Sequence, residues 1–493
     1  MLLGDDGPNG WGIKYAREFD MTNDSKLFPP RPKWEADGYH PDEYSRWLKG
    51  DWRPIAELWA ELGVNPLPAG ERCCAQPPYD TLPIPRADVP TGIILSRAAD
   101  AWMREERVED VALPLYEGRM VSLFDFSEKG WVSGKGRKAE WRVIPWQSKG
   151  LEPQYLMAVG AYAGSESSGR PKLGFLAVGS GTNMRSMYCS ILPDLPSGNS
   201  VATLRVDGGT QRLLGLLQRM VTFVFDYVIR MKLTGVNLNY FVIDEAPLSE
   251  KSGSSPLIQA CTSLSFPSQL FSPEWIRITR GDPRTSPWRR WWAVTPHERV
   301  RERAAVDAVA LAEASLSEDD GLHLLRDCDW CGPISRPLDP KGFWRVEKDK
   351  DPELRHTVLT LVAFHDLQEK IRACGGDRDK GSEAFLAQND GEGWMLPETL
   401  RLADYGLGHD ERAKEPQPVA SRLGPRFYDW QLAQSAEESW RECHLHARNL
   451  LGEAGYRQLL DEIEAEKRGE RSAARSVFAP ASSRVEKQGK LFE

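Results

Sequence analysis

Short apolar runs separated by glycine turns dominate the chain from residue 111 to about residue 180. β-Branched and aromatic residues are frequent in these runs, which is typical of strands. Between two groups of runs lies the small polar segment GSESSG, which predicts a flexible turn. The expected strands are VALPLY, MVSLFDF, AEWRVIPW, YLMAVGAYA, LGFLAVG, SMYCSIL and, further on, NLNYFVID. The pattern therefore predicts a strand-rich region in the first half of the chain.

Apolar residues recur with helical spacing on both sides of this region. The run from Pro41 to about Leu62 has an apolar face that contains Trp47, Ile55, Leu58 and Trp59. A second helix is expected over residues 211–233, where nearly every side is apolar and Gly235 supplies a stop signal. The second half predicts helices with charged faces at Arg299–Ala314, Leu354–Ala373 and Tyr428–Gly469.

These patterns divide the chain into four parts and place it in the mixed α+β class. The expected parts are a linker and helical region (1–110), a strand-rich region (111–250), a mainly helical region (251–465) and a flexible polar tail (466–493). The most apolar stretch, Leu213–Met231, contains four polar or charged residues and is too polar to span a membrane. We therefore expect no membrane partner.

Composition narrows the class of protein further. The chain has 493 residues, 41% hydrophobic and 27% charged, which is typical of a soluble globular protein. Eight cysteines in such a length are too sparse for a disulfide scaffold. The first residues show no basic segment followed by an apolar core, so no secretory signal is expected. The predicted location is the cytoplasm.

One basic segment departs from the overall net charge of −9. Residues 129–149 contain six Lys or Arg side chains and one acid, Glu140. A local positive charge of this kind attracts phosphates. The residues expected to contact DNA here are Trp131, Gly134, Lys135, Gly136, Arg137, Lys138 and Arg142. The glycines would let the backbone approach a ligand, and Arg137 could reach guanine instead of a phosphate. The alternative is a solvated hairpin tip.

Other side chains suited to nucleic acid occur later in the chain. Asn183 and Arg185 could bind base edges, although Asn183 could equally stabilise a turn through its neighbouring backbone. Asn237 and Asn239 are interpreted as structural. Arg289 and Arg290 stand among tryptophans, where they could stack on bases or on their own aromatic neighbours.

Several short segments of the sequence resemble the region that follows the catalytic domain in long bacterial adenine-N6 DNA methyltransferases. These are enzymes of restriction-modification and phage-defence systems. The matching words are PLYEGRM, FDF, KGWVSGKGR and EPQYL, and similar segments stand in the same order at Trp11–Phe28, Gly181–Leu204 and Phe225–Pro247. Together they cover roughly the first half of the chain. The resemblance implies that residues 111–250 recognise a DNA target and that residues 251–465 clamp the duplex.

The motifs that carry methyl transfer in that family are missing. No Phe-x-Gly-x-Gly turn for S-adenosylmethionine is present. The nearest sequence to the Asn/Asp-Pro-Pro-Tyr/Phe motif is Gln76-Pro77-Pro78-Tyr79, which has Gln at the essential position. The resemblance therefore implies a target-recognition subunit or fragment with no catalytic residue, which depends on a methylase polypeptide for S-adenosylmethionine. The alternative is a non-catalytic DNA-binding scaffold or sensor of a defence complex.

Two further motifs give weaker expectations. Cys328 and Cys331 form a single C-x-x-C pair, and Cys443, His444 and His446 are more than a hundred residues away, so we expect no metal site. His356 and His365 are expected to be packing residues in a helix. The tail carries Gln488, Leu491 and Phe492 in the spacing of a peptide that docks on the replication sliding clamp, a match short enough to arise by chance.

Overall fold

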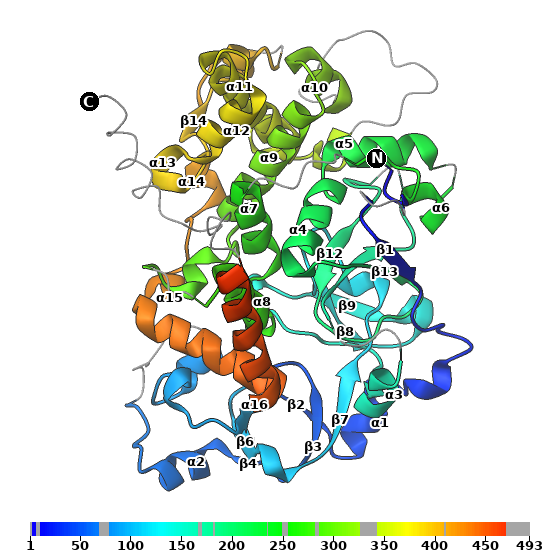
Figure 1. Cartoon of the computed structure of the whole chain (residues 1–493), viewed down its shortest axis with the longest axis vertical. Helices are drawn as coiled ribbons and strands as arrows, with labels where there is room; N and C mark the ends of the chain where they lie inside the picture. Colours follow the sequence, from blue (N-terminus) through cyan, green and yellow to red (C-terminus); the bar gives the residue numbers. More distant parts are fainter. Residues whose placement is uncertain are drawn as a thin grey trace.

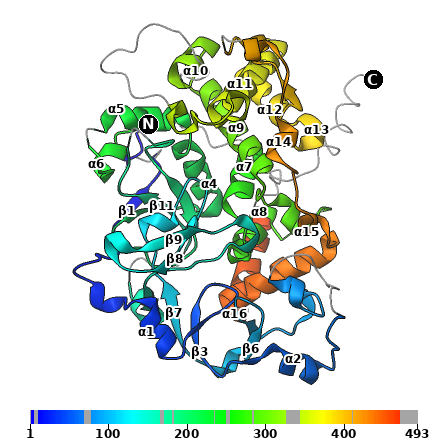
Figure 2. The same ribbon diagram turned by 180° about the vertical axis from the view of Figure 1, so that it is seen from behind.

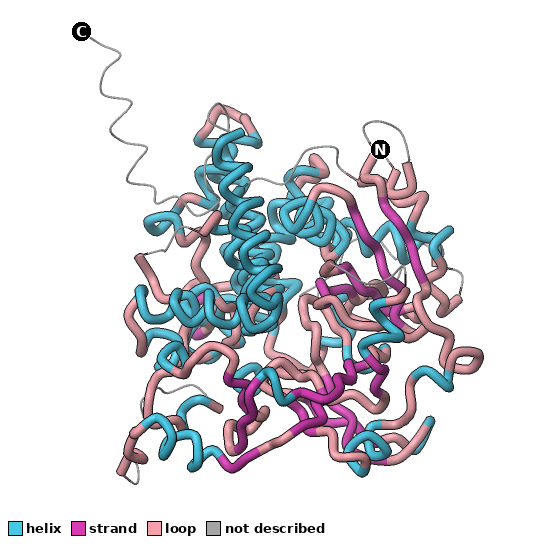
Figure 3. The backbone as a smooth tube through the Cα atoms, turned by 60° about the horizontal axis from the view of Figure 1, so that its bottom comes forward, coloured by secondary structure: helices cyan, strands magenta, loops and turns pink. Residues whose placement is uncertain are grey.

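The structure is a computed structural model that describes residues 2–5, 10–68, 78–165, 170–180, 183–233, 235–248, 255–281, 285–325, 343–408 and 411–469. Helix accounts for 49% and strand for 17%, with several small antiparallel sheets and a helical C-terminal region. The predicted α+β class is therefore confirmed. Figure 3 shows the strands gathered at the bottom and right, and the longer helices stacked at the upper left.

The central sheet contains four antiparallel strands in the order β1 (Ile13–Ala16), β13 (Val201–Val206), β11 (Lys172–Leu176) and β12 (Cys189–Leu192). Leu173 of β11 lies opposite Leu204 of β13, and both side chains are fully buried. Helix α4 (Gly209–Met220) packs against this sheet, which explains why its leucines have no exposed face. Helices α5 (Phe223–Lys232) and α6 (Tyr240–Ile243) follow it.

The other strands form smaller sheets around the N-terminal part of the chain. One has the order β10 (Leu156–Ala158), β7 (Val108–Pro114), β3 (Trp47–Gly50), β2 (His40–Pro41). Another joins β4 (Arg53–Pro54), β6 (Ala101–Arg104) and β5 (Ile93–Leu95), and helix α2 (Ile55–Leu62) covers a small core around Trp102. Strands β8 (Lys129–Ser133) and β9 (Glu140–Val143) form a separate hairpin. Helices α1 (Arg31–Ala36) and α3 (Val159–Ala163) complete this part.

The C-terminal part is built from helices. They are α7 (Ser255–Ser265), α8 (Ser272–Thr279), α9 (Pro296–Glu313), α10 (Glu318–Leu325), α11 (His356–Ala373), α12 (Arg378–Leu386), α13 (Gln388–Gly391), α14 (Ala420–Leu423), α15 (Asp429–Leu432) and α16 (Ala436–Gly469). The short strands β14 (Thr399–Leu400) and β15 (Gln417–Pro418) pair between them. In Figure 1 the last helix, α16, returns to the N-terminal part and lies against it. Among the described residues, no helix combines the length and apolarity needed to cross a bilayer.

One large hydrophobic core joins the strand-rich and helical parts. It contains Leu204 of the central sheet, Val309 of α9 and Leu459 of α16. The predicted helices over 299–314 and 354–373 are confirmed. The helix predicted over 428–469 is divided into α15 and α16 by residues 433–435, and α16 has a further break at Gly452, where φ is +68°. The four-part division of the chain stays a prediction.

Five further predictions of local structure are wrong. Residues 41–50 pair as strands instead of forming a helix, because Trp47 and Leu48 pair with β7, and helix α2 begins only after Pro54. MVSLFDF forms tight turns that place the buried Phe124 at φ +56°. Residues 159–163 turn from strand into α3, and YFVI of NLNYFVID is α6. The helix predicted over 211–233 is interrupted at Thr222, whose hydroxyl accepts a hydrogen bond from the Phe225 N–H and so begins α5.

Candidate nucleic-acid interface

The β8–β9 hairpin is fixed to the body of the protein along one edge. The backbone N–H of Trp131 donates to the Glu152 carbonyl at 2.8 Å, whereas the bond from the Ile144 N–H to the Glu128 carbonyl, at 2.9 Å, closes the open end of the hairpin itself. A Cβ atom at Gly130 would lie 2.3 Å from Glu152 Oε2. The absence of a side chain at Gly130 therefore allows the Glu152 carboxylate to pack against β8. Figure 2 shows the hairpin on the near side of the molecule.

The hairpin tip has a defined conformation. A 3-10 turn spans Gly136–Lys138, and the Gly134 carbonyl accepts hydrogen bonds from Trp131 Nε1 at 3.0 Å and Gln154 Nε2 at 3.2 Å. Gly134 has φ +78°, and a Cβ there would lie 2.3 Å from the Lys138 carbonyl oxygen. This glycine is thus required by the turn itself. Gly136 has φ +55° and open space around it, so only this glycine fits the expected approach to a ligand.

Three cations at the tip have no carboxylate partner. Lys135, Arg137 and Lys138 are exposed, and within the described part of the chain no carboxylate oxygen lies within 4.0 Å of their charged groups. Arg142 differs, because it pairs with Glu152 at 2.5 Å, and Glu152 also pairs with Arg97 at 3.1 Å. The positive charge available to a ligand is therefore concentrated at the tip.

The tryptophans near the hairpin hold the protein's own cations. The Arg31 guanidinium lies 4.7 Å from the ring centroid of Trp131, and that of Arg119 lies 5.9 Å from Trp141. Trp146 is contacted by both Lys149 at 4.2 Å and Arg299 at 3.9 Å. Trp131 is also buried. The expectation that Trp131 contacts DNA is therefore corrected, because its buried ring packs against Arg31 within the protein.

Two apolar side chains are exposed on the hairpin strands. Val132 of β8 is 46% exposed and Val143 of β9 is 65% exposed. Val143 stands opposite Lys129 in the register, while Val132 lies at a bulge where the register shifts. The hairpin thus combines apolar strand positions with a basic tip.

Asn183 and Arg185 occupy different environments although they are close in sequence. Arg185 is fully buried; its Nη2 donates to Asp307 Oδ2 at 2.9 Å and its guanidinium stacks 3.3 Å from the Phe223 ring centroid. Burial acts to raise the pKa of Asp307, but Arg185, His356 and the Phe223 N–H together outweigh it and leave that pKa below its usual value. The expected base contact of Arg185 is wrong. The Asn183 backbone forms a turn with Ser180, while its side chain stays exposed.

Arg289 and Arg290, which stand among tryptophans, stack on aromatic side chains of the protein itself, the alternative to stacking on bases. Arg289 is buried, pairs with Glu442 and lies near the rings of Trp288 and Trp292. Its charge keeps the pKa of Glu442 well below the usual value, although burial acts in the opposite direction. Arg290 pairs with Glu392 and stacks on Phe427 at 4.9 Å. The predicted DNA contact of Arg289 is thus replaced by internal contacts, whereas Arg290 is partly exposed and its DNA contact stays a prediction.

The remaining asparagine and tyrosine candidates are also engaged internally. Asn239 Oδ1 accepts a hydrogen bond from Arg17 at 2.8 Å, as its structural interpretation implies, and Asn237 forms an isolated bridge with Val178. Tyr79 is buried and donates its hydroxyl to Glu43 at 2.7 Å, so its ring cannot stack on a flipped base. Gln76 and Pro77 lie outside the described residues.

The histidines and cysteines do not converge. His446 contacts Tyr44 at 2.9 Å, and His444 contacts Tyr456 at 2.8 Å. Within the described ranges, no three His, Cys, Asp or Glu side chains are placed to hold a metal ion. His356 packs in α11 and contacts Asp307, and burial lowers its pKa to about 4. Cys328 and Cys331, like Gln488, Leu491 and Phe492 of the tail, lie outside the described residues.

Sequence reasoning missed the residues that hold the hairpin in place. Glu152 neutralises Arg142, and Gln154 and Arg31 fix the tip and Trp131. Glu152 and Gln154 belong to the motif EPQY, which the family resemblance includes, but the motif does not indicate which arginine Glu152 neutralises. Searches against protein-family models, curated proteins and solved structures find no match for this chain.

Proposed function

We propose that this chain is the DNA target-recognition part of a site-specific adenine-N6 DNA methyltransferase of the restriction-modification or phage-defence type. The observation that carries the proposal is the β8–β9 tip, where Lys135, Arg137 and Lys138 have no carboxylate partner among the described residues, although the chain has a net charge of −9. Such cations attract a polyanion and gain counterion release when they bind phosphates. The resemblance of the surrounding words to that enzyme family supports the same assignment.

The shape of the hairpin favours a duplex. A two-stranded β-ribbon fits the major groove of DNA. The exposed Val143 and Val132 are suited to apolar contact with thymine methyl groups, and the basic tip is suited to the phosphates beside the groove. Asn183, with its exposed side chain, is the remaining candidate for a base edge.

Under this proposal a partner polypeptide catalyses methyl transfer and supplies the S-adenosylmethionine pocket and the adenine-binding motif. Both polypeptides would act in the cytoplasm. Docking of the C-terminal tail on the sliding clamp would be an additional contact. The second candidate function is a non-catalytic DNA-binding scaffold or sensor. The family resemblance is also consistent with this second function, because the matching segments include no catalytic motif.

The experiment that separates these functions is methyl transfer from labelled S-adenosylmethionine to duplex DNA. It uses the chain alone, the product of a neighbouring methylase gene alone, and the mixture. Activity that requires the mixture supports target recognition for a split enzyme. DNA binding without activity in any mixture supports the scaffold, and activity of the chain alone contradicts the assignment of catalysis to a partner.

A further inference from the structure

Arg303, on helix α9 near the hairpin, has no carboxylate partner among the residues that the structure describes. Arg299 and Arg303 are one helical turn apart and therefore face the same side of α9. Arg299 donates to the carbonyls of Ala293 at 2.9 Å and Phe124 at 3.0 Å, and it stacks on Trp146, three residues after β9. Along the axis of α9, Arg303 is thus one turn, about 5.4 Å, beyond Arg299, which contacts the segment after β9.

Arg303 is only partly satisfied by the protein. Its Nε is buried without a hydrogen-bond partner, and its Nη2 reaches only Met184 Sδ, at 4.0 Å. No carboxylate within the described ranges lies within 4.0 Å of its guanidinium. Burial and, after it, the neighbouring Arg185 lower the pKa of Arg303 to about 10. A guanidinium in this state lacks the acceptors that its five N–H groups require.

The two carboxylates whose charges act on the pKa of Arg303, Asp307 and Glu347, are already engaged by other groups. Asp307 accepts hydrogen bonds from Arg185, His356 and the Phe223 N–H. Glu347 accepts from the backbone N–H groups of His356 and Thr357. The buried Arg185 and Arg289 differ from Arg303, because each of them has a carboxylate partner. The described residues therefore supply no free carboxylate that could accept hydrogen bonds from Arg303.

Arg303 lies near the surface on this side of α9. Arg303 is only partly buried, and so are Met184 and Tyr188 beside it. Asn183, next to Met184, exposes its side chain. An anion that reaches Arg303 therefore also meets a hydrogen-bonding side chain and lies within a helical turn of the segment that supports the hairpin.

We infer that Arg303 is a second backbone contact for the same duplex, binding a phosphate oxyanion of nucleic acid on the α9 side of the hairpin. A phosphate provides paired acceptors that match the guanidinium fork and supplies the charge that Arg303 lacks. This inference rests on the proposed function, and it extends the interface from the hairpin tip to α9.

The test compares Arg303→Met with Arg185→Met, a matched removal of an arginine that has its carboxylate partner. We measure the thermal midpoint and the affinity for a mixed-sequence duplex over a range of salt concentrations. Arg303→Met should keep or raise the midpoint, because an unpaired desolvated charge is removed. Its affinity should fall roughly tenfold, and the slope of log K against log salt should shrink by about 0.9. Arg185→Met should lower the midpoint, because Asp307 loses its partner.

A third variant separates this inference from the proposed function. Replacement of Lys135, Arg137 and Lys138 by Ala should weaken binding whether or not Arg303 contacts DNA. If that variant loses affinity while Arg303→Met keeps both the wild-type affinity and slope, the Arg303 assignment is overturned and the hairpin interface stands. Absence of duplex binding by the wild-type chain overturns the proposed function, and the inference falls with it.

Discussion

Gly134 and Gly136 have different roles although both stand in one short loop. Both adopt a positive φ, which costs other residues about 1 kcal/mol or more. Only Gly134 also lies against another atom, because a Cβ there would meet the Lys138 carbonyl oxygen. The position of Lys138 therefore depends on Gly134, and the basic tip depends on a glycine that need not touch the ligand.

Gly134→Ala should destabilise the protein by at least about 2 kcal/mol locally and weaken DNA binding, because the turn must open to admit the methyl group. Gly136→Ala, with the same added methyl but open space, is the control and should cost about 1 kcal/mol. Urea denaturation followed by tryptophan fluorescence measures both. Equal effects of the two substitutions would contradict the packing role of Gly134.

Glu274 gives a prediction for pH. This carboxyl is buried in α8, and burial raises its pKa to about 7 from the ordinary value of 4.5. Because the folded pKa is the higher one, the folded state binds more protons between these values, and stability falls as pH rises from about 4.5 to about 7. The loss attributable to this group is at most about 3 kcal/mol.

Glu274→Gln should therefore flatten the pH dependence of the unfolding free energy in this window. The measurement is the urea midpoint at about pH 5 and about pH 7.5 in the wild type and the variant. Glu117 and Glu302, whose pKa values burial also raises to about 7, leave part of the dependence in place. An unchanged difference between the two pH values would show that Glu274 ionises normally in the folded protein.

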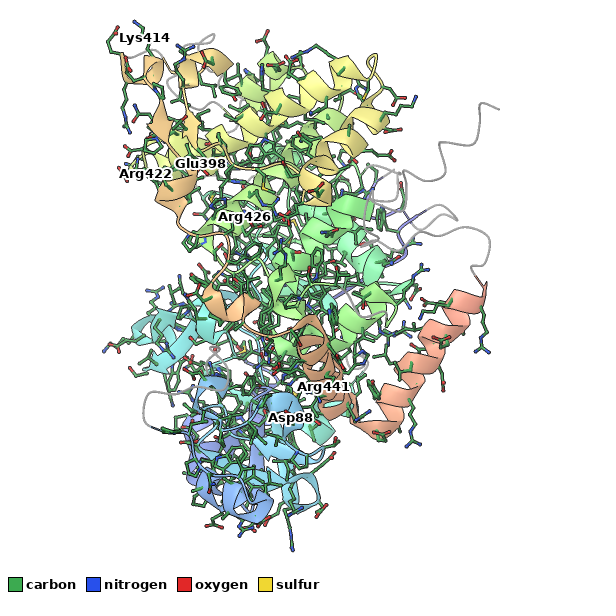
Figure 4. All side chains as sticks on the ribbon, turned by 90° about the vertical axis from the view of Figure 1, so that its left-hand side faces the viewer. Asp88, Glu398, Lys414, Arg422, Arg426 and Arg441 are labelled. Atoms are coloured by element: carbon green, nitrogen blue, oxygen red, sulfur yellow. The ribbon has the colours of Figure 1, made fainter. Side chains whose placement is uncertain are left out.

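Helix α16 shows how buried ion pairs connect distant elements. Glu442 pairs with Arg289, and His446 contacts Tyr44 of the N-terminal part. On the exposed side of the same helix, the preceding residue Arg441 pairs with Asp88 at 3.0 Å, and Figure 4 shows these two side chains close together at the surface. The inner pair is desolvated and the outer pair is hydrated, so they should differ greatly in energetic importance.

Glu442→Ala should destabilise the protein by about 3–5 kcal/mol, because Arg289 would remain buried without a carboxylate. Arg441→Ala is the matched control on the same helix and should cost less than about 1 kcal/mol. Chemical denaturation of both variants gives the comparison. Neither substitution should change the salt dependence of DNA binding by the folded protein, since neither residue lies in the proposed interface.

The elements differ in how far the sequence predicts them. The helices α9, α11 and α16 were predictable because apolar periodicity over many residues is a local signal. Residues 41–50 were not, because their pairing with β7 involves residues about sixty positions away. The exposed tip of the candidate site could be predicted from charge. The burial of Arg185 and Arg289 could not, since their partners lie 122 and 153 residues away.

The whole molecule has an uneven distribution of charge. Its net charge is −9, yet the hairpin tip and Arg303 carry positive charge that pairs with no carboxylate in the described part of the chain. On another part of the surface, a hollow of about 350 Å³ is lined by Asp88, Glu437 and Glu438 together with Arg441. Acidic surfaces of this kind repel a polyanion, so a duplex should approach in one orientation only.

The central claim is that this chain binds duplex DNA through the β8–β9 tip. The most direct test is the affinity for a mixed-sequence duplex as a function of salt, for the wild type and for the variant with Ala at positions 135, 137 and 138. We predict a linear dependence of log K on log salt whose slope shrinks by up to about 2.7 in the variant, with an unchanged thermal midpoint. The same affinity and slope in both proteins would contradict the claim.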